Sequence, residues 1–163
     1  MYWYCINIHP RKEDYVEINL SRLGVESFNP KLKERKFIRR VLKEAITPLF
    51  PCYIFARFDI ETHLRGVKYT KGVRKIVSAG SSPIPVEDNI IGAIRDRLDG
   101  DGYLSINRTF NSGDHLRIKD GPFSGFKGVF ERDIGRDRVI ILLNMLYNQV
   151  HLTLFKEQLE KID

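Results

Sequence analysis

The sequence predicts an α+β protein in which an N-terminal α/β sandwich is followed by a small β-barrel. Residues 1–99 alternate strand-like and helix-like segments, whereas residues 109–163 contain short strand-like segments separated by glycines. The charge divides the chain at the same place. The first 100 residues carry 18 Lys or Arg against 12 Asp or Glu, and residues 101–163 carry 9 of each.

The N-terminal strands are predicted where aromatic and branched residues cluster: Tyr2–Ile8, Val25–Phe28, Tyr53–Phe58 and Val73–Val77. Helices are predicted where apolar residues recur at helical spacing or where a short helix fits between strands: Pro10–Leu23, Ile60–Tyr69 and Glu87–Leu98. This order of elements is typical of a sheet covered by helices.

A basic segment at Lys31–Lys43 interrupts this order, with seven basic residues against the single acid Glu34. Its apolar residues are sparse, so we expect an extended arm or hairpin. Such a stripe attracts phosphate backbones, although a solvated face of the fold would have the same composition.

Glycine-containing polar stretches mark the domain boundary, at Asp99–Gly102 and Asn111–Asp114. We therefore predict a first domain at residues 1–99, a linker at 100–108 and a second domain at 109–163. Strands of the second domain are predicted at His115–Ile118, Phe126–Phe130 and Arg138–Leu143, and through Val150, Leu152 and Leu154.

The sequence offers little support for an enzyme. The histidines at 9, 63, 115 and 151 lack metal-ligand spacing, and none of the common nucleophile, phosphate-loop or zinc motifs occurs. Asp59, Glu61 and His63 lie close together and would suit a metal-dependent nuclease, but a solvated helix start explains them better. We therefore expect no metal and no cofactor.

Membrane insertion and export are not expected either. No apolar run approaches the ~20 residues that a membrane helix needs, and the N-terminus lacks a signal peptide. Cys5 and Cys52 are the only cysteines and form no CxxC pair, which suits a reducing compartment. We expect a cytoplasmic monomer.

Several motifs together resemble the NusG family of transcription elongation factors. Those of its N-terminal domain are Trp3-Tyr4, Pro48-Leu49-Phe50-Pro51-x-Tyr53-x-Phe55 and Gly72-Val73-x-x-Ile76-Val77. That of its KOW domain is Gly113-Asp114 followed by Asp120-Gly121-Pro122-Phe123-x-Gly125-Phe126-x-Gly128. The resemblance covers essentially the whole chain, and it implies that the barrel is an SH3-like KOW barrel.

The resemblance also implies partners. Such N-terminal domains dock on the clamp helices of RNA polymerase through an apolar pocket, which Phe50, Pro51, Tyr53 and Phe55 match, with Tyr4 nearby. Docking suppresses pausing by favouring the active polymerase state. The KOW domain, through the projecting Phe123 and Phe126, would recruit a small-subunit ribosomal protein or the termination factor Rho.

Within the family, the sequence is similar to the specialised RfaH-like antiterminators. His63 matches the start of their contact with the opposite polymerase pincer, but Leu64 and Arg65 replace its threonines. Positions that contact the non-template DNA strand are matched by Arg39, Thr70 and Lys71. We expect phosphate contacts from the basic residues of this set together with Lys36 and Arg40.

Residues 139–154 fit two secondary structures. Helical spacing joins Val139, Leu142, Leu143, Leu146, Val150 and Leu154, whereas Val150, Leu152 and Leu154 also alternate as a strand. The RfaH-like resemblance implies that the KOW region can form an α-helical hairpin over the polymerase pocket. The β-branched residues at 139–141 favour strand, so we expect the barrel by default.

A ribosome-associated KOW protein that binds RNA is the main alternative. KOW motifs occur in ribosomal proteins and the chain is basic, with a net charge of +6. The excess charge lies in the first 100 residues, however, and an RNA-binding KOW domain should carry its own basic patch. The sequence therefore favours the transcription factor.

Overall fold

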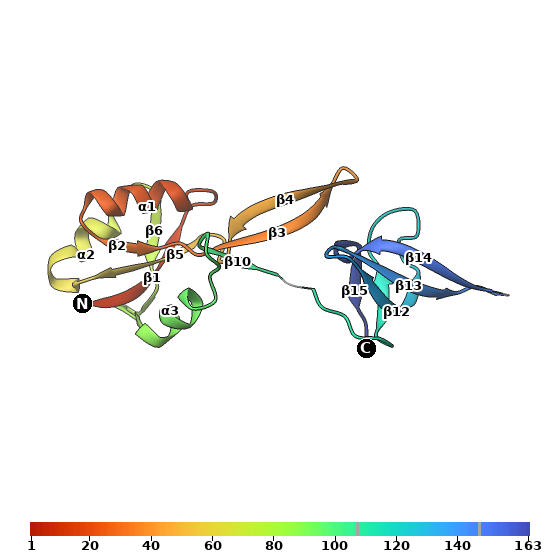
Figure 1. The fold of residues 1–163 in the computed structure, drawn as a ribbon. Helices are drawn as coiled ribbons and strands as arrows, with labels where there is room; N and C mark the ends of the chain where they lie inside the picture. Colours follow the sequence, from red (N-terminus) through yellow and green to blue (C-terminus); the bar gives the residue numbers. More distant parts are fainter. Residues whose placement is uncertain (107, 147) are drawn as a thin grey trace. The chain divides into compact units, whose positions relative to one another are not determined.

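The computed structural model describes residues 1–106, 108–146 and 148–163 (Figure 1). The chain divides into two compact units, residues 1–33 with 46–105 and residues 34–45 with 106–163. Position 107 of the predicted linker and position 147 of the segment with two periodicities lie outside the described residues. Among the described helices, none has the length and apolar character to span a bilayer.

The first unit is built on an antiparallel sheet in the order β2-β5-β1-β6. Its strands are β1 (Tyr2–Ile8), β2 (Glu26–Phe28), β5 (Tyr53–Phe58) and β6 (Val73–Ile76), with β9 (Pro85–Val86) also paired to β1. The central strands β1 and β5 are antiparallel, and Tyr4 lies opposite Ala56. The four predicted strands are confirmed to within one residue at each end.

Helices cover both faces of this sheet. Figure 1 shows α1 (Glu13–Arg22) and α2 (Ile60–Lys68) on one side and α3 (Asp88–Arg95) on the other. The main core lies under α1 and α2 and includes Ile6, Ile8, Val16, Leu20, Ile54 and Val67. A smaller core of Trp3, Phe55 and Ile91 lies under α3.

The helix starts correct one reading of the sequence and agree with another. The first helix begins at Glu13 rather than at Pro10, because Arg11 has φ +62° and a turn precedes the helix. The Asp59 side chain accepts a hydrogen bond from the backbone N–H of Glu61 (3.2 Å) and caps α2. Asp59 and Glu61 therefore form a helix start, as expected.

The basic segment forms a two-stranded hairpin, β3 (Lys31–Ile38) and β4 (Val41–Pro48), joined by Arg39 and Arg40. A third strand, β10 (Tyr103–Ser105), pairs parallel with β3, although the sequence analysis placed these residues in a linker. Asp99 turns the chain toward it, because Oδ1 accepts from the backbone N–H of both Asp101 and Tyr103 (2.9 Å each). Three residues are too few to show a period.

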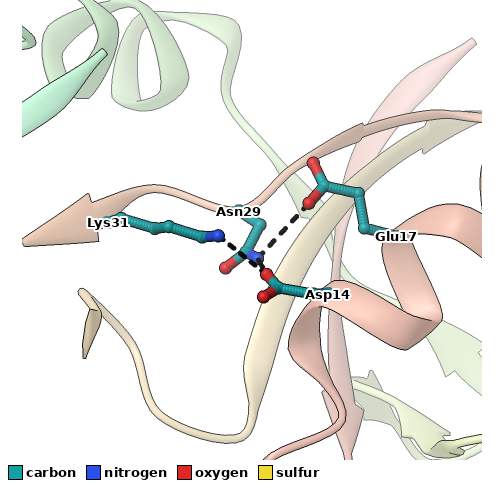
Figure 2. Close-up of polar contacts among 4 residues, drawn as sticks. All are labelled: Asp14, Glu17, Asn29 and Lys31. Carbon is teal, nitrogen blue, oxygen red and sulfur yellow. Dashed lines mark hydrogen bonds and ion pairs between the residues drawn. The ribbon is translucent and has the colours of Figure 1, made fainter. Parts of the chain in front are cut away.

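The start of this hairpin is attached to α1 by side chains (Figure 2). The Asn29 amide donates to Asp14 Oδ1 (3.1 Å) and Glu17 Oε2 (3.4 Å), and Lys31 Nζ lies 2.8 Å from Asp14 Oδ1. The hydrogen bond with Asp14 raises the pKa of Lys31. The acids of α1 thus fix where the hairpin begins.

The second unit contains a five-stranded antiparallel sheet in the order β14-β13-β12-β11-β15. Its elements are β11 (His115–Ile118), β12 (Lys127–Ile134), β13 (Arg138–Asn144), β14 (Gln149–Phe155), the 3-10 turn η1 (Lys156–Gln158) and β15 (Leu159–Lys161). Leu116, Ile141 and Leu159 lie in its core. The strands confirm the expected β state, and residues 139–154 form no helix within the described part of the chain. No pairing joins β14 to β15 among the described residues.

Candidate functional site

Aromatic side chains gather on the α3 side of the first sheet. We call Phe28, Phe50, Tyr53 and Phe55 the aromatic surface. The Phe55 ring stacks on Phe28 (centroids 6.3 Å apart) and meets the edge of Phe50 (5.7 Å). Phe55 is only 8% exposed, whereas Phe50 is 37% and Tyr53 39% exposed. Phe55 therefore supports the surface, and Phe50 and Tyr53 present it.

The two exposed rings sit at the ends of a tight turn. The backbone N–H of Tyr53 donates to the carbonyl of Phe50 (3.0 Å). Pro51 restricts the second position, and Cys52 occupies the third with φ +69°. This is the pattern of a type II turn, whose third position is usually glycine or asparagine. The turn projects both rings from one short segment.

Arg95 of α3 forms the rim of the aromatic surface. Its guanidinium lies 5.2 Å from the ring centroid of Trp3 and 5.0 Å from that of Phe28. The same side chain pairs with Glu26 at 3.0 Å. Cation–π contacts of this kind hold the end of α3 against β1 and β2.

Two predicted contact residues are not on the surface. Tyr4 is 2% exposed and packs on Phe58 (4.7 Å between centroids) in the core under α1 and α2, on the opposite face of β1 from Trp3. Thr70 is 9% exposed, and its hydroxyl donates to the carbonyl of Gly66 (2.7 Å). The structure therefore separates Tyr4 from the aromatic surface and does not present Thr70 to a partner.

The residues predicted to face the polymerase pincer lie on α2. Leu64 packs against the main core, His63 is half-buried with Nδ1 2.6 Å from Thr62 Oγ1, and Arg65 is exposed. The three side chains therefore do not form one surface. Only Arg65 is freely presented.

A pocket of about 530 Å³ adjoins Tyr53 and contains basic residues that the sequence analysis missed. Leu64 and Ile76 line its apolar part, and Lys68, Arg74 and Lys75 supply positive charge. The signal was present in the sequence, because residues 65–75 hold five basic residues and no acid.

The predicted DNA-contacting bases lie in different environments. Arg39 and Arg40 are exposed in the hairpin turn, with φ +52° and +64°. Lys36 lies 2.7 Å from Glu34 Oε1, and Lys71 is exposed before β6. Arg39 and Arg40 thus present positive charge to solvent at the tip of the hairpin.

The second unit also exposes apolar side chains. Phe123 and Phe126 are 37% and 48% exposed, with their rings edge to face at 6.1 Å. Met145 and Leu146 are 50% and 94% exposed between β13 and β14. Helical spacing places Leu146 in an apolar stripe, and no sequence motif singles out Met145. Only their position after the end of β13 shows that both side chains face solvent.

Among the described residues, the polar side chains form no evident metal site. In the described part of the chain, His, Cys, Asp and Glu side chains do not gather in groups of three that could hold a metal ion. The features that stand out are apolar and basic surfaces, which suit binding of macromolecules.

Comparison with known proteins agrees with the motifs. The family model described as transcription termination factor nusG matches residues 1–95. The transcription termination/antitermination protein NusG of Helicobacter pylori is 22% identical over 174 residues, covering 99% of each chain. That of Escherichia coli K12 is 30% identical over 118 residues, which are 69% of this chain and 64% of the relative.

The same family occurs among solved structures. A structure of Thermotoga maritima NusG, described as showing its domain interaction, covers 99% of this chain at 21% identity with a TM-score of 0.39. The family match over residues 1–95 includes the strands and the turn that carry the aromatic surface. The chain is therefore a transcription factor rather than an enzyme, and it belongs to the NusG family.

Proposed function

We propose that the chain binds RNA polymerase through the aromatic surface and acts as an elongation and antitermination factor. The observation that supports this most directly is the pair of exposed rings, Phe50 and Tyr53, at one well-defined turn. Exposed aromatic side chains on a rigid support are common energetic centres of protein interfaces. Little order is lost when such a turn binds, because it is already formed.

The partner segment that suits this surface is a pair of helices, as in the polymerase clamp. Phe50, Pro51 and Tyr53 would enter the groove between helices, and Phe55 would support them from below. Binding would favour the active elongation state of the polymerase over its paused state. The factor would thus shift the equilibrium between these two states, and it would make or break no covalent bond. Of the residues assigned to the pincer contact, Arg65 and the half-buried His63 stay in this proposal, and Leu64 leaves it because it packs on the core. Tyr4, which was assigned to the clamp pocket, leaves the proposal for the same reason.

The test is binding of the full chain to core RNA polymerase. Phe50→Ala and Tyr53→Ala should each weaken binding by roughly 10- to 100-fold, the usual range for a central aromatic residue. Tyr69→Ala is the matched control, since Tyr69 is 73% exposed at the end of α2, and its removal should change affinity less than about twofold. Circular dichroism and thermal unfolding check that each variant folds.

Equal affinity of all three variants and the wild-type chain would contradict the proposal. Co-sedimentation with ribosomes in place of polymerase binding would favour the ribosome-associated alternative. The neutral charge of residues 101–163 argues against that alternative, because RNA binding needs excess positive charge.

The basic residues Lys36, Arg39, Arg40 and Lys71 support a further part of the proposal, contact with the non-template DNA strand. Affinity for single-stranded DNA should fall with salt, with a slope of about 0.7 per phosphate contact. Replacing both Arg39 and Arg40 by Ala should lower that slope by about 1.4. An unchanged slope would remove the hairpin turn from the DNA contact.

The exposed side chains of the second unit support recruitment of a partner, either a small-subunit ribosomal protein or Rho. Phe123 and Phe126 form an edge-to-face pair on the surface, and Leu146 extends from another turn. Phe126→Ala should weaken binding of that partner and leave polymerase binding unchanged. Loss of both would mean that the second unit itself contacts polymerase.

A further inference from the structure

The turn that carries Phe50 and Tyr53 is disfavoured by its own sequence. Its third residue, Cys52, has φ +69°, a region in which the Cβ of an L-residue crowds the backbone. Glycine avoids this conflict, and cysteine does not. Something outside the turn must therefore keep Cys52 in this conformation.

Three hydrogen bonds from distant parts of the chain converge on the backbone of Cys52. Its carbonyl accepts from the backbone N–H of Ile8 (2.9 Å) and from the Asn7 amide (3.2 Å). Its N–H donates to Glu13 Oε1 at 2.9 Å. Both polar groups of the peptide backbone at Cys52 are thus held by β1 and α1, and Glu13 holds the donor.

Glu13 is well suited to this task. It is the first residue of α1 and only 7% exposed, so its carboxylate lies in a confined position beside the helix N-terminus. The helix dipole favours a negative charge there, and an ionised acceptor makes a stronger hydrogen bond than a neutral one. A buried carboxylate that accepts a backbone N–H is a directed contact rather than a solvated surface charge.

The neighbouring acids of α1 serve another segment. Asp14 and Glu17 contact Asn29, and Asp14 also pairs with Lys31, at the start of the basic hairpin (Figure 2). Glu13 contacts the aromatic turn. One helix therefore fixes both ends of the segment between Asn29 and Cys52 with different side chains, which provides a matched control.

We propose that Glu13 is a positioning residue for polymerase binding, because it holds the Phe50–Tyr53 turn in the conformation that presents the two rings. The inference rests on the proposed function of the aromatic surface. Without the Glu13 contact, the strained turn should populate other conformations. The apparent affinity is then the affinity of the competent form multiplied by the fraction of molecules that keep the competent turn.

The experiment compares polymerase binding of the full chain in Glu13→Ala, Glu13→Gln, Asp14→Ala and Cys52→Gly, and in the double variant Glu13→Ala/Cys52→Gly. Glu13→Ala should weaken binding about 10-fold or more, the range expected on losing a hydrogen bond to a charged group. Glu13→Gln should weaken it less, since its amide oxygen still accepts. Asp14→Ala should change it less than about twofold, since it leaves Cys52 untouched.

The double variant separates positioning from general stability. Glycine adopts positive φ without support, so Cys52→Gly should restore most of the binding lost in Glu13→Ala. Equal binding in folded Glu13→Ala and Asp14→Ala, or no recovery in the double variant, would overturn the proposal. If Glu13→Ala does not fold, Glu13→Gln takes its place. Weaker binding by Glu13→Gln that is restored when Cys52→Gly is added would support the proposal. Unchanged binding by Glu13→Gln would refute it.

Amide exchange in the free protein keeps the two proposals distinguishable. Glu13→Ala should speed exchange of the Cys52 amide, whose hydrogen bond it removes, more than Asp14→Ala does. If Phe50→Ala and Tyr53→Ala leave polymerase binding intact, the proposed function fails. Faster exchange at Cys52 would then show that Glu13 holds the turn for another partner, and unchanged exchange would refute the positioning role itself.

Discussion

Two loops present aromatic side chains to solvent, and they are held in different ways. The Phe50–Tyr53 turn places a cysteine at positive φ and is fixed by contacts from Asn7, Ile8 and Glu13, at least 39 residues away in sequence. The loop at residues 120–126 places glycines at its positive φ positions, Gly121 (+93°) and Gly125 (+90°). Its hydrogen bonds are largely local, as in Ser124 N–H to Gly121 O and Gly125 N–H to Ile118 O.

The difference shows two routes to the same result. In a glycine-rich loop the glycines adopt positive φ without support from the rest of the fold, so the loop geometry follows from a short motif. A loop without glycine depends on the surrounding fold, so a distant substitution can alter the surface that it presents. Substitutions in the two loops should therefore have different consequences for stability.

The largest difference in stability is expected between removing a buried aromatic side chain, Phe55, and removing an exposed one, Phe126. Phe55→Ala should destabilise the first unit by about 3–4 kcal/mol, because it removes a buried ring that supports both Phe28 and Phe50. Phe126→Ala, at 48% exposure, should cost about 0.5 kcal/mol or less in the second unit. Urea unfolding of each variant measures both values. Similar losses would mean that the second loop also rests on a buried aromatic support.

The second effect concerns glycines within one motif. An added Cβ at Gly128 would lie 2.8 Å from the carbonyl oxygen of Leu142 and 2.9 Å from Leu143 Cδ2, whereas Gly125 has open space. Gly128→Ala should therefore cost about 2–3 kcal/mol from overpacking. Gly125→Ala should cost about 1 kcal/mol, from positive φ alone. Chemical denaturation would contradict this account if Gly125→Ala proved the more destabilising.

These two loops also show what the sequence could predict. The glycine motif identified the second loop and its exposed Phe123 and Phe126, since positive φ and glycine coincide there. Strand alternation placed Tyr53 and Phe55 on one face, and residue clustering located the main strands. These signals act within a few residues along the chain.

Contacts across the fold escaped the same reasoning. Tyr4 lies in β1, where both faces are apolar, so alternation could not show that it faces α1 rather than the aromatic surface. Glu13 reads as an ordinary acid in the first turn of a helix, and its contact with Cys52 depends on how that helix packs. Strand β10 pairs with a strand about 70 residues earlier and has no period of its own.

The third prediction concerns Cys52→Gly, which gives the Phe50–Tyr53 turn a glycine at its positive φ position, as in the loop at residues 120–126. Cys52→Gly should stabilise the first unit by about 1 kcal/mol, because glycine relieves the strain of positive φ. For a unit of this size, the midpoint of thermal unfolding should rise by about 4–8 °C. Cys52→Ala keeps the strain and removes only the thiol, so it should bring no comparable gain. Equal stabilisation by both substitutions would attribute the effect to the thiol.

The smallest effect concerns Asp114, a carboxylate that accepts a local hydrogen bond and also pairs with the last strand of the second unit. Asp114 Oδ2 accepts from the backbone N–H of Asn111 (2.9 Å), and Oδ1 lies 3.0 Å from Lys161 Nζ. The Asn111 hydrogen bond first, and then Lys161, lower the pKa of Asp114. A lowered pKa in the folded state means that the ionised group stabilises the fold.

That stabilisation should be present above the unfolded-state pKa of about 3.9, and it should be lost as the pH falls through the lower pKa of the folded state. Asp114→Asn should therefore unfold more easily than the wild-type chain at pH 7, and the difference should shrink below pH ~4. Asp163→Asn, after the last strand, controls for the loss of one surface charge. A difference that stayed constant with pH would show that shape at residue 114, rather than its charge, holds Asn111 and Lys161 together.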